Sequence, residues 1–370
     1  MKSKVYFADM HCRKNEDNKA AKIEKLCNAV GLKSILKRDD ITAIKLHFGE
    51  MGNDTHLRPQ LVRKVVDLVK QEKAKPFLTD TNTLYSGSRK NAIDHINTAY
   101  AHGFAPCTVN APVIIADGLN GQSQVDVPVN LKHFKETHIG REIHDADSMV
   151  VLSHVKGHEM AGFGGALKNL AMGCASFWGK RDQHQTRVAM DKNICIGCAS
   201  CAKICPAHAI SMEKDANGKK TAHADPNKCI GCFECITVCE PKAITAAWET
   251  ELSAFVERIA EYAYGAVQNK KDKVIYINFV MNVTPDCDCV AWSDTPMIAD
   301  IGILASTDPV AIDKASYDLV KQAQSLQPME NNGVNIDKFS HRWEHTHGYH
   351  QIEYAAEIGL GSLDYELIKI

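Results

Sequence analysis

Eight of the fourteen cysteines in this 370-residue chain lie between residues 195 and 239, where they form two units offset by 34 residues. Each unit has the spacing Cys-x2-Cys-x2-Cys-x3-Cys, with a glycine just before the second cysteine. The first unit comprises Cys195, Cys198, Cys201 and Cys205, and the second comprises Cys229, Cys232, Cys235 and Cys239. Three thiolates so close in sequence can surround one face of a metal cluster, and the glycine permits the tight turn that this requires. The repeat therefore predicts a small unit that is built twice around two metal centres.

The same spacing binds [4Fe-4S] clusters in bacterial ferredoxins that carry two of them, and there the fourth cysteine of each unit ligates the other cluster. We therefore predict that one cluster is bound by Cys195, Cys198, Cys201 and Cys239, and the other by Cys229, Cys232, Cys235 and Cys205. Four-cysteine zinc sites also use Cys-x2-Cys pairs, but zinc does not explain a third cysteine in both units. One departure from the ferredoxin pattern is the proline after Cys239, which comes one place late at Pro241. We therefore expect residues 188–246 to form a small α+β, two-cluster ferredoxin-like domain.

The chain on either side of this segment alternates between strand-like and helix-like patterns. Apolar runs typical of strands occupy residues 5–8, 42–46, 77–79, 113–116, 149–152 and 274–279. Helical patterns lie between them, with starts at Pro59 and at Asp308-Pro309 and an end at Gly31. Such alternation predicts an α/β fold with a largely parallel sheet and helices on both faces. Because the ferredoxin-like segment interrupts this body, we expect residues 1–187 and 247–370 to be two parts of one α/β domain.

Ionisable and metal-binding side chains follow the carboxyl ends of several expected strands. They are His47, His154, His158, Lys168, Cys287 and Cys289. Because ligands bind at the carboxyl ends of strands in open α/β sheets, we expect these residues to share a ligand or metal site. Cys287 and Cys289 are two residues apart, and in an extended segment both thiols would face one side and could chelate a soft metal. The alternatives are two unrelated loop cysteines and histidines with purely structural hydrogen bonds.

Residues 162–170 are glycine-rich and begin a helix, where backbone N–H groups and Lys168 could hold an anion. The glycine spacing fits neither a dinucleotide-binding loop nor a Walker loop. Close packing of the helix against the sheet explains the glycines equally well, so both roles stay open for this segment.

Four runs outside the cysteine repeat resemble a known family. They cover residues 43–50, 79–85, 164–169 and 308–313, and they are similar to segments of the bacterial and archaeal family of unknown function numbered 362. The resemblance extends over nearly the whole chain, and members of this family are often described as iron–sulfur centre proteins. It implies cluster binding and a cytoplasmic, largely anaerobic setting, and it implies no particular substrate.

Charge and hydropathy exclude several other classes of protein. Lys and Arg number 43 against 45 Asp and Glu, so there is no basic excess that would favour nucleic-acid binding. No apolar run approaches the roughly 18 residues of a membrane-spanning helix, and the sequence enters a strand-like run soon after Met1 without the features of a signal peptide. We therefore expect a cytoplasmic protein whose cysteines serve metal or redox chemistry rather than disulfides.

These observations predict an iron–sulfur electron-transfer protein that acts as an oxidoreductase. Two clusters would pass single electrons, received from a redox partner protein, to a small-molecule ligand or to a further metal at Cys287 and Cys289. The alternative is a non-catalytic electron carrier or adaptor whose α/β body docks a partner enzyme. A redox sensor is a third hypothesis, disfavoured because a sensor needs only one cluster. A carrier needs little beyond the ferredoxin-like segment, so the large remainder of the chain favours the oxidoreductase.

Overall fold

The computed structural model describes residues 2–370 apart from residues 186, 215, 230, 232 and 248–251. Among the described residues, eight strands form one large sheet in the order β16-β1-β15-β14-β7-β2-β3-β4. Their bounds are β1 Ser3–Asp9, β2 Ile41–Lys45, β3 Lys75–Asp80, β4 Val113–Ile115, β7 Ser148–His154, β14 Val274–Val280, β15 Gly302–Ser306 and β16 Tyr365–Lys369. Neighbouring strands are parallel except where β15 pairs with β1 and β14. The prediction of a largely parallel α/β sheet is therefore confirmed, and each expected strand is present.

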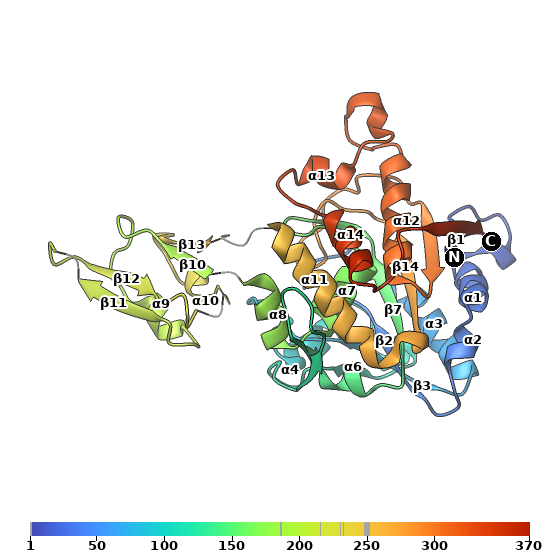
Figure 1. Cartoon of the computed structure of the whole chain (residues 1–370), viewed down its shortest axis with the longest axis horizontal. Helices are drawn as coiled ribbons and strands as arrows, with labels where there is room; N and C mark the ends of the chain where they lie inside the picture. The colour runs from blue at the N-terminus through green and yellow to red at the C-terminus, as the bar shows by residue number, and fades with distance from the viewer. Residues whose placement is uncertain (1, 186, 215, 230, 232, 248–251) are drawn as a thin grey trace.

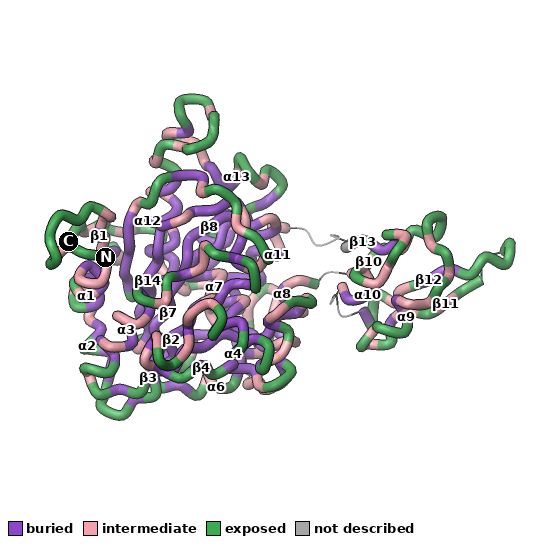
Figure 2. Tube along the Cα trace, turned by 180° about the vertical axis from the view of Figure 1, so that it is seen from behind, coloured by how far each residue is buried: buried purple, intermediate pink, exposed green. Residues whose placement is uncertain are grey.

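Side chains of the central strands alternate between two apolar cores, one on each face of the sheet. Along β7, Met149 and Val151 belong to one core, whereas Val150 and Leu152 belong to the other. Because successive residues of a strand point to opposite faces, both faces of the sheet are covered. Figure 2 shows the resulting concentration of buried residues in this part of the chain.

Helices supply the other half of each core. The helices α7 Ala166–Cys174, α11 Leu252–Val267, α12 Pro309–Gln322 and α14 His350–Glu357 contribute to the first core, and α1 Lys19–Val30, α3 Pro59–Gln71 and α4 Ala92–Ala101 contribute to the second. Shorter helices are α2 Leu32–Ile35, α5 Pro106–Val109, α6 Arg141–Asp145, α8 Phe177–His184 and α13 Lys338–Arg342. The predicted helix boundaries are confirmed, because Gly31 ends α1 in the left-handed conformation and the side chain of Asp308 caps α12. Among the described residues, no helix is both long enough and apolar enough to cross a membrane.

The sequence pattern does not reveal β15, although this strand lies inside the sheet. It has only five residues and runs antiparallel to both neighbours. A Cβ atom at Gly302 would overlap the carbonyl oxygen of Ala8, so glycine is needed for the close approach of β1. Two further hairpins lie outside the large sheet, β5 Gln124–Pro128 with β6 Glu136–Gly140 and β8 Lys156–His158 with β9 Gly162–Gly164.

The cysteine-rich segment forms its own group of elements, which Figure 1 shows to one side of the large sheet. Its strands pair as β10 Arg187–Met190 with β13 Ile244–Ala247 and as β11 Ile210–Lys214 with β12 Lys220–Ala224, and its helices are α9 Ser200–Ile204 and α10 Glu234–Thr237. Positive φ angles recur with the spacing of the sequence repeat, at Gly197 and Gly231, at Ala199 and Phe233, and at His208 and Lys242. The two units of the repeat therefore share one local backbone conformation.

Candidate functional site

The carboxyl ends of β2, β3, β7 and β14 meet at one edge of the sheet, because these strands run parallel to one another. Beyond this edge lies a cavity of about 220 Å³ whose lining includes His47, His158, Lys168 and Cys289. A smaller adjoining space shares His47 and Lys168 with it and is also lined by His154 and Cys287. The structure therefore brings together the six side chains that follow the strands in the sequence. We call the larger space the strand-end cavity.

Cys287 and Cys289 lie in a turn after β14, so the expectation of an extended segment is wrong. The N–H of Val290 donates to the carbonyl oxygen of Cys287 at 3.2 Å, which closes the turn. The N–H of Glu50 donates to the carbonyl oxygen of Asp288 at 2.8 Å. The turn is thereby fixed to the loop that follows β2.

The carboxylate of Asp288 is buried beneath this turn, with 1% of its side chain exposed. Its oxygens lie 2.8 Å from Nδ1 of His154 and 3.3 Å from Nζ of Lys156. Burial by itself would raise the pKa of Asp288, but the positive charges of His154 and Lys156 outweigh it and hold the pKa well below its ordinary value. Buried charges therefore hold the cysteine turn against β7 and β8.

The two thiols of the turn have different electrostatic surroundings. Cys287 accepts a hydrogen bond from Cys289 and lies 3.9 Å from Nζ of Lys168. The hydrogen bond and the nearby lysines lower the pKa of Cys287 well below its ordinary value in spite of burial. The same hydrogen bond, together with burial, raises the pKa of Cys289 well above its ordinary value. In the reduced pair these surroundings favour the thiolate form at Cys287 and the thiol form at Cys289.

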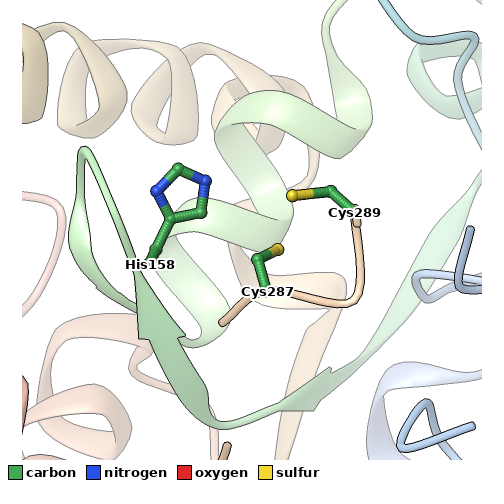
Figure 3. A group of neighbouring side chains, drawn as sticks. All are labelled: His158, Cys287 and Cys289. Carbon is green, nitrogen blue, oxygen red and sulfur yellow. The ribbon is translucent and has the colours of Figure 1, made fainter. Parts of the chain in front are cut away.

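His158 completes a group of three donors that could hold a metal ion. One ring nitrogen of His158 and the sulfurs of Cys287 and Cys289 all lie within 4.8 Å of one another. Figure 3 shows the imidazole with one ring nitrogen on the side of the two sulfurs. Within the part of the chain that the structure describes, this is the one such group of histidine, cysteine and acidic side chains.

The hydrogen bonds of His158 determine which ring nitrogen carries its proton. Nδ1 accepts the backbone N–H groups of Met160 and Ala161, both at 3.1 Å. A carboxylate oxygen of Glu159 lies 3.6 Å from the same nitrogen, beyond hydrogen-bonding distance. Burial lowers the pKa of His158 well below its ordinary value, so the ring is neutral with its proton on Nε2. A metal-binding histidine needs the opposite arrangement, with a free lone pair on one nitrogen and an N–H donating from the other. The donor set as held here does not fit a metal ion.

His47 and His154, the other two candidate histidines, have no free lone pair for a metal either. Nδ1 of His47 accepts the N–H of Gly49 at 3.0 Å, and Nε2 lies 3.0 Å from a guanidinium nitrogen of Arg89. Both ring nitrogens of His154 face acceptors, the carboxylate of Asp288 on one side and the carbonyl oxygen of Met281 at 2.9 Å on the other. His47 and His154 therefore support the site and are not ligands in it.

The glycine-rich start of α7 does not hold an external anion, because a carboxylate of the chain occupies it. Asp313 accepts the N–H groups of Ala166 at 2.7 Å and of Leu167 at 2.9 Å. A Cβ atom at Gly165 would overlap this carboxylate. Of the two roles left open by the sequence, the glycines serve close packing, and Lys168 points instead at the cysteine turn.

Sequence reasoning missed two cations of the strand-end cavity, Arg89 and Lys180. Arg89 is 2% exposed and donates to Glu50 at 3.1 Å and to the hydroxyl of Tyr85 at 2.6 Å. Tyr85 in turn donates to the carbonyl oxygen of Cys289 at 3.2 Å. Lys180 reaches the cavity from α8. Neither residue directly follows a strand, so a search of strand ends cannot find them.

Within the cysteine-rich segment, one cavity is lined by cysteines of both units. They are Cys195, Cys198 and Cys201 of the first unit and Cys239 of the second. Equivalent backbone N–H groups point at sulfur in the two units, from Ala209 to Cys205 at 3.3 Å and from Ala243 to Cys239 at 3.2 Å. Hydrogen bonds of this kind tune iron–sulfur clusters. In the other predicted set, Cys229 and Cys235 are buried, and Cys232 lies outside the described residues.

The second cysteine unit touches the strand-end cavity. Phe233, two residues before Cys235, is one of the side chains that line this cavity. The adjacent Glu234 accepts a hydrogen bond from the hydroxyl of Ser86 at 2.8 Å and forms an ion pair with Lys90. Both partners of Glu234 lie in the loop between β3 and α4, the same loop that supplies Tyr85 and Arg89.

The family model described as Domain of unknown function (DUF362) matches residues 42–318. No curated protein matches the sequence. Among solved structures, the chain is similar to the lactate racemase apoprotein from Thermoanaerobacterium thermosaccharolyticum, with 13% identity and a TM-score of 0.43 over 87% of this chain and 58% of that one. It is also similar to a protein from Thermotoga maritima, with 12% identity and a TM-score of 0.37 over 79% of this chain and 57% of that one. The chain thus spans less than two thirds of the length of either protein.

Proposed function

This chain belongs to the DUF362 family, and we propose that it is an iron–sulfur oxidoreductase. In this proposal residues 188–246 form a ferredoxin-like domain inserted into an α/β domain made of residues 1–187 and 247–370. The domain holds two [4Fe-4S] clusters, which supply electrons one at a time. The acceptor site is the strand-end cavity. We further propose that a redox partner protein delivers the electrons and that the protein works in the cytoplasm.

The observation that carries the proposal is the crossed arrangement of the cysteines. Cys195, Cys198, Cys201 and Cys239 line one cavity although Cys239 is far from the other three in sequence. A two-cluster ferredoxin requires this exchange of the fourth ligand between units. The matching N–H contacts at Cys205 and Cys239 support the same relation for the second set, Cys229, Cys232, Cys235 and Cys205.

The contact between the cysteine-rich segment and the body supports a route for electrons. Phe233 lies in the loop between Cys232 and Cys235, and it also lines the cavity that contains Cys289. The bonds of Glu234 to Ser86 and Lys90 hold this loop against the body. A cluster bound by the second unit would therefore lie beside the loop that borders the acceptor site.

Two cations of the cavity favour a small anionic substrate. The lining also includes the carboxylates of Asp80 and Glu159, and Asp80 is paired with Lys45 at 3.0 Å. Lys168 and Lys180 both line the cavity, and neither forms an ion pair with a carboxylate of the described residues. A buried or half-buried ammonium group without a carboxylate is stabilised by an anionic ligand. A cavity of about 220 Å³ has the size of a site for a small molecule rather than for a segment of a partner protein.

A metal centre at His158, Cys287 and Cys289 is a second candidate for the acceptor because the three donors lie close together. It would require the proton of His158 to leave Nε2, against the two backbone N–H groups that donate to Nδ1. A non-catalytic electron carrier remains the alternative to an enzyme, and a redox sensor is the third hypothesis. The cavity beside Phe233 favours the enzyme, because a carrier needs no small-molecule cavity next to its cluster.

Iron and acid-labile sulfide analysis, with electron paramagnetic resonance, on protein purified without oxygen tests the proposal. We expect about eight iron and eight sulfide ions per chain, four of each for each cluster. Cys198→Ser should lower the iron content and change the reduced-state spectrum, whereas the matched control Cys107→Ser, an exposed cysteine of the body, should change neither. Unchanged iron content in Cys198→Ser would contradict the ligand assignment. Metal beyond about eight iron ions would favour the metal-centre candidate.

A further inference from the structure

We propose that Cys287 and Cys289 form a redox-active dithiol that cycles through a disulfide and reduces small anionic disulfides in the strand-end cavity. The inference deepens the proposed function and rests on it for its source of electrons. It assigns the acceptor of those electrons to the chain itself, in place of a third metal.

The orientation of His158 favours a cysteine pair without a metal. Two backbone N–H groups, from Met160 and Ala161, donate to Nδ1, and a backbone N–H can only donate. Nε2 therefore carries the proton of the neutral ring, and Figure 3 shows the sulfur pair on that side of the ring. An N–H group that faces sulfur can donate to a thiolate, but it cannot coordinate a metal.

The two sulfurs are close enough to form a disulfide after a small movement. They lie within 4.8 Å of each other in a closed turn, and a disulfide needs a small movement of side chains to bring them into bonding distance. Only one residue, Asp288, separates the two cysteines, so the disulfide would close a small ring. Strained disulfides are the labile and catalytic ones, in contrast to structural disulfides that resist reduction.

Contacts with the surrounding residues hold the cysteine turn in place. Asp288 anchors the turn through His154 and Lys156, and the carbonyl oxygen of Cys289 accepts a hydrogen bond from Tyr85. Lys168 lies 3.9 Å from the sulfur of Cys287. These contacts keep the two sulfurs beside the cavity and place a positive charge where a thiolate forms.

The proposed reaction has two steps, reduction of the Cys287–Cys289 disulfide and then reduction of the substrate disulfide. In the first, the Cys287–Cys289 disulfide takes up two electrons, supplied one at a time by the reduced iron–sulfur clusters, and one proton from solvent, and it becomes one thiolate and one thiol. In the second, a sulfur of the pair attacks the disulfide bond of the substrate and releases one half of the substrate as a thiolate. The other sulfur of the pair then loses its proton to solvent, attacks the mixed disulfide and releases the remaining half as a second thiolate, so that the Cys287–Cys289 disulfide forms again. Lys168 and Lys180, neither of which pairs with a carboxylate of the described residues, select substrates that carry a carboxylate or another anionic group.

The test uses the full-length protein, purified without oxygen and then oxidised with 3,3′-dithiodipropionate, a small dianionic disulfide. After quenching in acid, free thiols are alkylated and the protein is digested. The mass of the peptide that contains both cysteines is then measured by mass spectrometry. We expect a disulfide within this peptide, its loss when dithionite reduces the clusters, and its return on addition of 3,3′-dithiodipropionate. Cystamine, the matched disulfide with amines in place of carboxylates, should oxidise the pair more slowly. This preference should disappear in Lys168→Gln.

Two variants separate the electron route from the thiol chemistry. In Cys235→Ser, which removes a predicted cluster ligand, dithionite should no longer open the disulfide, whereas a small dithiol should still do so. In Cys287→Ser, no disulfide should form in this peptide, and the iron content should stay that of the parent. A metal ion bound in addition to the cluster iron, and lost in Cys287→Ser, would overturn the proposal in favour of a metal centre.

The remaining outcomes are equally decisive. A peptide whose two cysteines stay unlinked under every oxidant overturns the dithiol. Protein without cluster iron whose pair is still oxidised by 3,3′-dithiodipropionate refutes the proposed function and supports the thiol chemistry. Protein with full cluster iron whose pair is opened by a small dithiol but never by cluster reduction refutes the inference and leaves the proposed function standing.

Discussion

Replacing Asp288 by asparagine should destabilise the body of the protein strongly, because it removes one charge from a buried network and leaves the opposite charges behind. The asparagine side chain has nearly the same shape and keeps one acceptor oxygen. Lys156, whose Nζ lies 3.3 Å from the carboxylate, then has no counter-charge at this position, and the same holds for His154. Only 1% of the Asp288 side chain is exposed, so water cannot take over the lost interaction.

The expected loss is about 3–5 kcal/mol in the free energy of unfolding, the usual cost of removing one partner from a buried ion pair. The double variant Asp288→Asn with Lys156→Met should recover part of this loss, because it also removes the buried charge that has lost its partner. Urea denaturation, followed by far-ultraviolet circular dichroism, measures both free energies.

The matched control is Asp286→Asn, two residues away in the same loop. Asp286 is less buried and accepts one hydrogen bond, from Trp292 at 3.1 Å, so its replacement should cost about 1 kcal/mol or less. A loss below about 1 kcal/mol for Asp288→Asn would refute the reasoning, since the network would then be contributing no more than a surface pair.

The difference between wild type and Asp288→Asn should also depend on pH in a defined direction. The folded-state pKa of Asp288 is held below its ordinary value of 3.8. Its contribution to stability is therefore fully present above about pH 4 and is lost as the pH falls through the folded pKa. The gap between the two unfolding free energies should narrow only in acid, and a gap that instead narrows from pH 5 to 8 would contradict this assignment.

Three further predictions concern other parts of the chain. The hydrogen bond to Asp182 raises the pKa of His138 from 6.5 to about 9, so this histidine contributes stability that is fully present below pH 6.5 and lost as the pH rises through about 9; His138→Gln should flatten that decline in urea denaturation. Gly157→Ala should cost about 1–3 kcal/mol and slow oxidation of the cysteine pair, because a Cβ atom there would overlap the carbonyl oxygen of Pro285 in the cysteine loop. Glu234→Gln should slow reduction of the cysteine pair by cluster electrons without changing the iron content, because it weakens the contact between the cysteine-rich segment and the body.

The predictions for Gly157 and Glu234 each have a matched control. A Cβ atom at Gly164 would meet only side-chain atoms, those of Lys168 and Lys156, so Gly164→Ala should cost less than the change at Gly157. Glu240→Gln changes an exposed carboxylate of the same segment and should leave reduction of the pair unchanged. Equal effects in a variant and its control would count against the structural reason given for that variant.

The sequence by itself determines the parts of the structure that depend on local pattern. The strands can be recognised in the sequence as apolar runs, most clearly at β7 and β14, where every residue is buried. Gly31, Pro59 and Asp308 mark helix ends through their own backbone and capping preferences. The parallel arrangement follows from the alternation of strands and helices, and it brings the residues that follow the strands to one edge. The ligand spacing of the cysteine repeat is likewise a local property, which is why the sequence alone suggests the crossed cluster assignment.

The tertiary structure decides what the individual side chains of the site can do. The sequence offers His47, His154 and His158 as equal candidates, but their roles depend on which donors and acceptors the fold places against each ring nitrogen. Two amides of the β8–β9 turn donate to Nδ1 of His158 and so place its proton on Nε2. Arg89, which lies in a loop with no local sequence signal, contacts Nε2 of His47. Such contacts join segments far apart in the chain, and no local pattern encodes them. The chemistry of the cysteine pair is therefore set by the packing around it, whereas its position after a strand is set by the sequence.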